Sequence, residues 1–223
     1  MVAGGALAAL LLCLNASVVI SAMGPLHKPK SVLETDHRAY LEMTWGLPWR
    51  AAVEPPYCWR VLAPGVAHGL VSTGLDINAA WYLLTNVSLF GFLVAFHALL
   101  RLQGFAGREA ALGLALLALL PAAVRWYQYQ YWMSDPPAML LVTLGFVAVE
   151  SGRTRWLPAL GPLGVATRES WLVVLPFELL RRVMAGGRSP DAVLRNVARS
   201  APRSSSSGRC SCPIPPRTIS LPC

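Results

Sequence analysis

The sequence contains little charge, and this shortage argues against an ordinary soluble fold. Only 13% of its 223 residues are charged, and Asp and Glu together number 11. An average soluble domain carries about 25% charged residues, because water must solvate its surface. The mean hydropathy is +0.48, so lipid rather than water is expected to surround much of this chain.

Cysteine is also scarce, and its spacing indicates no site. The five cysteines include no CxxC pair, so neither a zinc site nor a disulfide framework is predicted. No cofactor is predicted, and a divalent metal is left open because the residues show no ligand pattern. The net charge of +8 does not indicate a nucleic-acid partner, since Arg and Lys stand at the ends of apolar runs rather than on one face.

Long uncharged runs are what the sequence does contain. Residues 2–23 carry no charge, and residues 78–100 carry none apart from His97, which is expected to be packed rather than catalytic. Each run reaches the roughly 20 residues that a helix needs to cross a bilayer. The first run is either a membrane helix or a cleaved signal peptide, and its length and lack of Lys and Arg favour the helix.

Shorter apolar stretches extend this pattern to an all-α, polytopic integral membrane bundle with about five to six membrane segments. Further spans are expected at 110–124 and 138–149, and 61–75 is expected to be a short interfacial or half-inserted helix because it contains Pro and Gly. The predicted location is a bacterial-type inner or plasma membrane that the chain crosses several times. Membrane lipid is therefore a predicted partner.

Arginines beside the spans predict the orientation. The Arg-containing turns 101–109 and 150–155 are expected in the cytoplasm by the positive-inside rule. Loops 24–60 and 125–137 then share the outer side, where the Trp and Tyr residues of the second loop suit a membrane interface.

An Arg–Glu pair interrupts the last apolar stretch. In one continuous helix Arg168 and Glu169 would lie near the bilayer centre, where an Arg costs about 2.5–3.5 kcal/mol. Two short helices, 156–167 and 170–180, avoid this cost. A broken helical hairpin is therefore predicted near 167–170, with the charged pair at its outer end.

The composition changes near residue 200. Residues 1–200 are predicted to form the transmembrane domain, and residues 201–223 a disordered tail rich in Ser, Pro and Cys. The tail is either a flexible cytoplasmic segment or the product of a reading-frame shift that truncated the protein, and its abrupt start favours the second.

Polar residues gather on the outer side of this arrangement. The first loop supplies Glu34 and Asp36, its end supplies Arg60, the second loop supplies Asp135, and the hairpin supplies Arg168. An aspartate near an arginine stays ionised and can accept a hydroxyl proton, whereas a guanidinium binds phosphate bidentately. These residue types suggest a general base beside an anionic lipid headgroup.

Helix geometry selects among the acids of the first loop. If 36–45 is an interfacial helix, Asp36 and Tyr40 share a face, because they are one turn apart, and Glu42 points elsewhere. Glu34 then precedes the helix and is free to support or replace Asp36.

Four segments, in their order along the chain, resemble a known enzyme family. They are "DHRAY" (36–40), "RVLAP" (60–64), "SDPPAMLL" (134–141) and "ATRESWLVVLP" (166–176). Together they look like the N-terminal part of GT-C glycosyltransferases, polytopic enzymes that use polyprenyl-phosphate-linked sugars, such as the protein mannosyltransferases and the aminoarabinose transferases. The resemblance covers about residues 5–185 of this chain.

The resemblance implies a role for each residue. Asp36, or Glu34 in its place, would activate the acceptor hydroxyl, and Arg168 would contact the lipid phosphate. Arg60, Asp135 and Tyr40 would belong to the substrate site. The implied function is transfer of a sugar from a polyprenyl-phosphate donor to an acceptor hydroxyl at the outer membrane face. Family members have more helices than this chain, so it would be a truncated member, and whether it is itself an enzyme is left open.

Structural alternatives stand beside each role. Asp36 is otherwise a helix N-cap or a solvated loop acid, Arg168 pairs with Glu169 or extends to the interface, Asp135 is an N-cap before proline, and Arg60 is an interface anchor. Two other functions fit the same features. A transporter or channel fragment also contains buried charge and a broken helix. A non-catalytic membrane protein would bind neither a sugar donor nor an acceptor.

Overall fold

The computed structural model describes residues 2–23, 35–46 and 57–186, and every regular element in these ranges is a helix. The chain divides into two compact units, Met1–Leu175 and Pro176–Cys223. Within the second unit the described part is the end of helix α9, Val174–Gly186. The predicted tail 201–223 and the predicted boundary before it lie outside the described residues.

Two helices are long and apolar enough to cross a membrane. They are α1, Val2–Met23, and α4, Ile77–Leu102. The described part of the chain offers up to three spans if a bent helix pair, Gly107–Leu119 with Ala123–Tyr129, counts as one. The prediction of an all-helical chain with membrane-spanning segments is confirmed at this level.

The predicted span 110–124 is wrong as a single helix. Helix α5, Gly107–Leu119, ends before the extended residue Leu120, and the two arms of the bent pair meet at 63°. Pro121 then begins η2, a π-helix over Pro121–Arg125, which leads into α6, Trp126–Tyr129. Proline has no backbone N–H and disfavours a helical conformation in the residue before it, so Pro121 explains the break.

A first apolar core joins α1, α4, α5 and η2. Its buried members are Ala8, Leu11, Leu89, Phe92, Leu93, Leu114, Ala118 and Val124. Close approach of α1 to α4 depends on Gly4, where a Cβ atom would lie 2.5 Å from Nδ1 of His97. His97 is therefore packed against the backbone of α1, in line with its prediction as a packed residue.

A second core attaches two short helices to α4. Helix α2, Thr35–Trp45, and helix α3, Leu62–Ser72, contribute to a cluster of Tyr40, Met43, Ala63, Ala67, Trp81, Tyr131 and Trp132. Thr44 connects these elements. Its hydroxyl accepts a hydrogen bond from Nε1 of Trp81 at 3.1 Å, and its carbonyl lies 2.8 Å from Nδ1 of His68.

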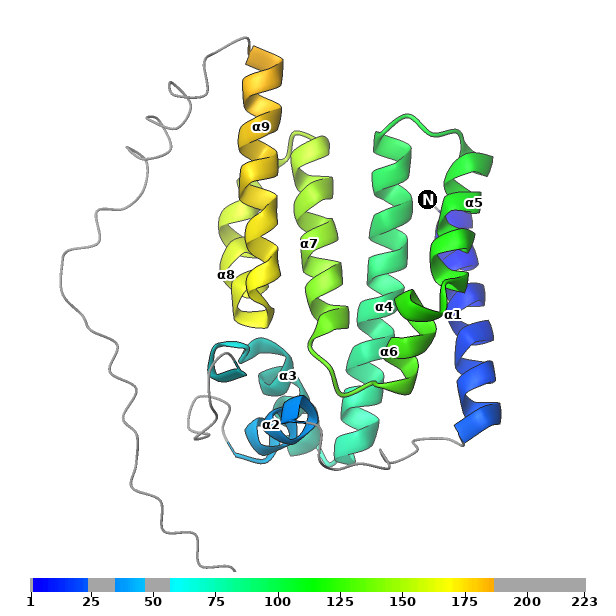
Figure 1. Ribbon diagram of the computed structural model, residues 1–223, viewed down its shortest axis with the longest axis vertical. Coiled ribbons are helices and arrows are strands. Elements are labelled where there is room, and N and C mark those ends of the chain that lie inside the picture. Colours follow the sequence, from blue (N-terminus) through cyan, green and yellow to red (C-terminus); the bar gives the residue numbers. More distant parts are fainter. Residues whose placement is uncertain (1, 24–34, 47–56, 187–223) are drawn as a thin grey trace, which may run out of the picture. The chain divides into compact units, whose positions relative to one another are not determined.

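Helices α2 and α3 lie at one end of the first unit. In Figure 1, α2 and α3 lie beside the N-terminal ends of α4 and of α7, Asp135–Glu150, whereas the turns after Leu102 and after Glu150 lie at the opposite end. This arrangement agrees with the expectation that 101–109 and 150–155 share one side. The assignment of that side to the cytoplasm stays a prediction.

The predicted break near 167–170 is confirmed. Helix α8, Leu157–Thr167, stops before Arg168, whose backbone is extended (φ −164°, ψ 140°), and η4 follows as a 3₁₀-helix over Glu169–Val173. The antiparallel return of the second arm stays a prediction, because that arm continues into the second unit.

Trp171 fixes the turn that follows the break. Its ring is buried, and its Nε1 donates to the carbonyl of Leu141 in α7 at 3.2 Å. A Cβ atom on Gly164 would lie 2.1 Å from this ring. Only glycine leaves room for the indole here, so Gly164 and Trp171 together hold Arg168 and Glu169 in position.

Candidate functional site

Charged and hydroxyl side chains from four separate segments meet at the α2 end of the first unit. We call them the paired-arginine cluster. It consists of Tyr40 from α2, Arg60 from the residue pair before α3, Ser134 and Asp135 at the start of α7, and Arg168 and Glu169 from the break after α8. Four of the six residues that sequence analysis assigned to a site are therefore brought together.

Arg60 lies at the centre of the cluster and is 7% exposed. Its Nη2 and Nε atoms donate to the two carboxylate oxygens of Glu169 at 2.5 Å and 3.2 Å, and its Nη1 donates to the Tyr40 hydroxyl at 3.3 Å. The guanidinium also lies over the ring of Tyr57, 5.8 Å from its centroid. This bidentate geometry is the strong form of an arginine–carboxylate contact.

Tyr40 connects α2 to α7 and is 1% exposed. Its hydroxyl lies 2.8 Å from Oγ of Ser134. Its ring meets the rings of Tyr57 and Trp81 at centroid distances of 5.8 Å and 6.0 Å. Because both its ring and its hydroxyl are in contact with other side chains, the position of α2 relative to α7 is well defined.

Arg168 forms an ion pair with Asp135, Nη1 to Oδ1. The two side chains are 32% and 18% exposed, so this pair faces solvent more than Arg60 does. Asp135 is the first residue of α7, where a negative charge interacts favourably with the helix dipole.

Two structural alternatives from the sequence are wrong. Asp135 is not the N-cap of α7, because Ser134 occupies that position. Arg168 does not pair with its neighbour Glu169, which instead binds Arg60. The extended backbone at Arg168 directs adjacent side chains to different sides, so each finds a separate partner.

The charges of the cluster perturb one another. Hydrogen bonds from Arg60 lower the pKa of the Glu169 carboxyl below its ordinary value. Burial alone lowers the pKa of Arg60, but its hydrogen bonds to Glu169 and Tyr40 outweigh burial and raise it. Both groups are therefore held in their charged forms.

The predicted general bases lie at the edge of what the structure describes. Asp36 belongs to the first turn of α2, one turn before Tyr40, and its side chain is outside the described part. Glu34 lies outside the described residues altogether. Glu42 pairs with Arg38 at 2.8 Å on the exposed face of α2, so it points away from the buried face of Tyr40, as expected.

Sequence reasoning missed two members of the cluster. Glu169 was considered only as a partner of its neighbour, and Ser134 was not considered. The sequence carries a partial signal for Glu169, because an acid in an apolar stretch needs a cation, but it does not indicate which arginine supplies that cation. No comparable signal marks Ser134.

Within the described ranges, no three His, Cys, Asp or Glu side chains lie close enough together to hold a metal ion. The cluster offers paired guanidinium and carboxylate groups instead.

Comparison with known proteins identifies no relative of this chain. No family model matches it, and neither a curated protein nor a solved structure is significantly similar to it.

Proposed function

We propose that the chain acts as a GT-C-like membrane glycosyltransferase, which moves a sugar from a polyprenyl-phosphate donor to an acceptor hydroxyl at the outer membrane face. One observation carries the proposal. Tyr40, Arg60, Asp135 and Arg168 come from distant parts of the sequence and meet in one cluster beside the start of α4, a candidate membrane span. The end of a membrane span lies near the lipid headgroups, and the phosphate of a lipid-linked donor is expected there.

The proposed reaction begins at α2. The Asp36 carboxylate accepts the proton of the acceptor hydroxyl, and the hydroxyl oxygen attacks the anomeric carbon of the sugar. The bond between that carbon and the phosphate oxygen breaks, and the polyprenyl phosphate leaves with the electron pair. Asp36 suits this role because α2 is attached to α3 and α4 through Thr44 and Tyr40, so the base is held on a fixed element.

The two arginines take different parts in this proposal. Arg168 is the better phosphate ligand, because it is partly exposed and Asp135 occupies only Nη1 of its donors. Its charge would stabilise the leaving phosphate as negative charge develops. Arg60 directs Nε and both terminal nitrogens toward Glu169 and Tyr40, so we assign it a positioning role. Tyr40 has the same role, because it is buried.

The test uses the chain in proteoliposomes with a radiolabelled polyprenyl-phosphate sugar. Replacing Asp36 by Asn should lower transfer by about 10²–10⁴-fold, since it removes the base and keeps the size of the side chain. Glu42→Gln is the matched control, because it neutralises an exposed acid on the same helix. Arg168→Ala should weaken donor binding as well as turnover.

Equal transfer by the parent chain and Asp36→Asn would contradict the assigned base. Donor binding that Arg168→Ala leaves unchanged would contradict the phosphate site. Absence of both transfer and donor binding in the parent chain would overturn the proposed function.

A transporter fragment is a second candidate, favoured by the 63° bend between the two arms of the third candidate span. Broken helices are common at transporter substrate sites. Flux of solute into liposomes that contain the chain, without sugar transfer, would support this candidate over the first.

A further inference from the structure

The charges of the paired-arginine cluster balance one another. Its two guanidinium groups, on Arg60 and Arg168, are matched by the two carboxylates of Glu169 and Asp135. A phosphate that binds here therefore adds negative charge to a site that is already neutral. The carboxylate closest to that phosphate then affects its binding, because like charges held close together repel each other.

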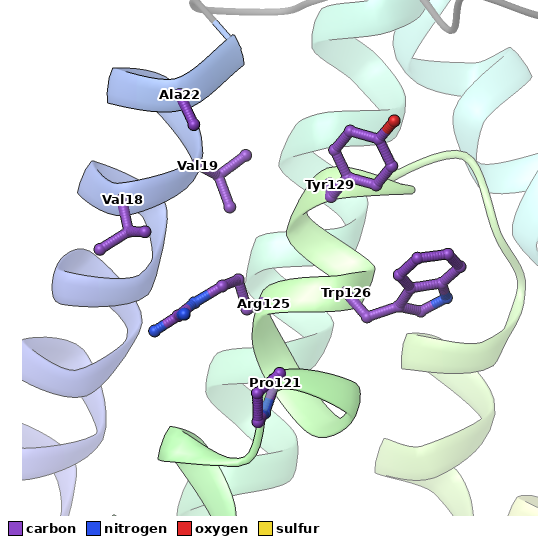
Figure 2. Close-up of a pocket in the computed structure, with 7 residues that line it drawn as sticks. All are labelled: Val18, Val19, Ala22, Pro121, Arg125, Trp126 and Tyr129. Carbon is purple, nitrogen blue, oxygen red and sulfur yellow. The ribbon is translucent and has the colours of Figure 1, made fainter.

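The described part of the chain also contains a cavity, which does not suit an anion. The cavity has a volume of about 300 Å³, lies between the last turns of α1 and the η2–α6 segment, and presents no polar surface. Figure 2 shows Arg125 extending from η2 toward α1. There its Nε donates to Oδ1 of Asn15, near the middle of the α1 span. The groups that suit a phosphate are therefore those of the paired-arginine cluster.

Asp135 is held beside Arg168 by one contact. Within the described ranges, Nη1 of Arg168 is the one hydrogen-bond donor to the Asp135 carboxylate. Glu169, by contrast, binds Arg60 with both of its oxygens, at 2.5 Å and 3.2 Å. The Asp135 carboxylate is thus the less neutralised of the two, and it lies beside the arginine that we assign to the donor phosphate.

The two prolines after Asp135 remove other donors. A helix start normally offers four free N–H groups, and those of its second and third residues bind capping oxygens and anions. Pro136 and Pro137 occupy these two positions of α7 and have no N–H. The helix therefore donates few hydrogen bonds to the Asp135 carboxylate or to a phosphate beside it, and Arg168 must serve both.

The proposed reaction increases the charge on the phosphate. The donor is a phosphate diester, which carries a single negative charge. When the bond between the anomeric carbon and the phosphate oxygen breaks, that oxygen keeps the electron pair, and the proton of the acceptor hydroxyl goes to Asp36. The polyprenyl phosphate that leaves is a monoester with a charge of about −1.5 to −2 at pH 7. Asp135 therefore repels the product more strongly than it repels the donor.

We propose that Asp135 promotes release of the polyprenyl phosphate product, because it weakens binding of the monoester more than it weakens binding of the diester donor. This role rests on the proposed glycosyl transfer. Arg168 attracts both lipids, and Asp135 sets the difference between them. Without the Asp135 charge, the product would stay on Arg168 longer and block entry of the next donor.

The test compares polyprenyl phosphate with its methyl ester, a diester that represents the donor without requiring its sugar to be known. Native mass spectrometry of the detergent-purified chain measures the affinity for each lipid. Asp135→Asn should raise the affinity for the monoester by about tenfold and that for the diester by less, since the repulsion scales with the charge on the phosphate.

Two control variants accompany this measurement. Glu42→Gln removes the same charge from an exposed pair on α2 and should leave both affinities unchanged. Asp135→Glu keeps the charge and should bind the two lipids in the same ratio as the parent chain. Asp135→Ser removes the charge with a residue that suits a helix start, and it decides the question if Asp135→Asn does not fold.

Failure of this role is distinguishable from failure of the proposed function. A ratio of affinities that stays unchanged without the Asp135 charge would overturn the role. Equal weakening of both lipids would also overturn it, because Asp135 would then only hold Arg168 in place, and so would unfolding of both neutral variants. A parent chain that binds neither lipid would overturn the proposed function, and this role with it.

Discussion

Arg60 and Arg125 are both partly withdrawn from water, yet they have opposite surroundings. Arg60 is 7% exposed and meets both oxygens of Glu169, whereas Arg125 is half-buried and makes one long hydrogen bond to the amide oxygen of Asn15. Removing the partner of a buried, neutralised cation destabilises a fold, because the charge is left buried and unpaired. A cation without a counter-charge has no such partner to lose.

The largest expected effect comes from the packing that positions the paired-arginine cluster. Gly164→Ala would place a Cβ atom 2.1 Å from the Trp171 ring, and overpacking of this kind costs up to about 3 kcal/mol. We expect a lower melting temperature in detergent and altered tryptophan fluorescence. Gly69→Ala is the control, since nothing lies within 4 Å of its new Cβ atom. A Gly164→Ala protein that is as stable as this control would contradict the packing.

The second prediction concerns the ion pair between Arg60 and Glu169. Glu169→Gln leaves the Arg60 guanidinium without its counter-charge. The cost should be about 1–2 kcal/mol, below the value for a fully buried pair, because the Glu169 side chain is 58% exposed. The measurement is chemical unfolding in detergent. Glu42→Gln, in the exposed pair with Arg38, should cost less than about 0.5 kcal/mol. Equal costs for the two variants would contradict the special surroundings of Arg60.

A smaller effect should appear as pH is lowered. Because Arg60 lowers the pKa of Glu169 from its ordinary 4.5, the stabilisation is fully present above pH 4.5 and is lost as pH falls through the lower folded-state value. The melting temperatures of the parent chain and Glu169→Gln should therefore begin to converge as pH falls below 4.5. A difference between them that stays constant from pH 7 to about pH 3 would contradict this linkage.

Sequence reasoning succeeded where a single local conflict had one solution. The break at Arg168 was predictable, because a charged pair cannot remain in the middle of an apolar helix. The short helix over Leu62–Ser72 and the packing of His97 followed from composition in the same way. Proline at 121 was equally visible, and the predicted span 110–124 failed because hydropathy was given more weight than the missing backbone donor.

The pairing of charges was not predictable, because it depends on which segments the fold brings together. Arg60 and Glu169 are 109 residues apart in the chain, and no local pattern connects them. Asn15 and Arg125 are 110 residues apart, and the sequence around Asn15 gives no sign of this contact. Local sequence thus indicated which residues are costly to bury, and the tertiary structure determined which partner each of them contacts.

The smallest expected effect on stability sharpens the comparison most. Arg125→Gln in lipid-free detergent should change the free energy of unfolding by less than about 0.5 kcal/mol, because no carboxylate is left without a partner. Arg60→Gln in the same assay should cost more, since it removes three hydrogen bonds. If Arg125→Gln were as destabilising as Arg60→Gln without lipid, Arg125 would be part of the fold rather than a free cation, and the contrast between the two arginines would be wrong.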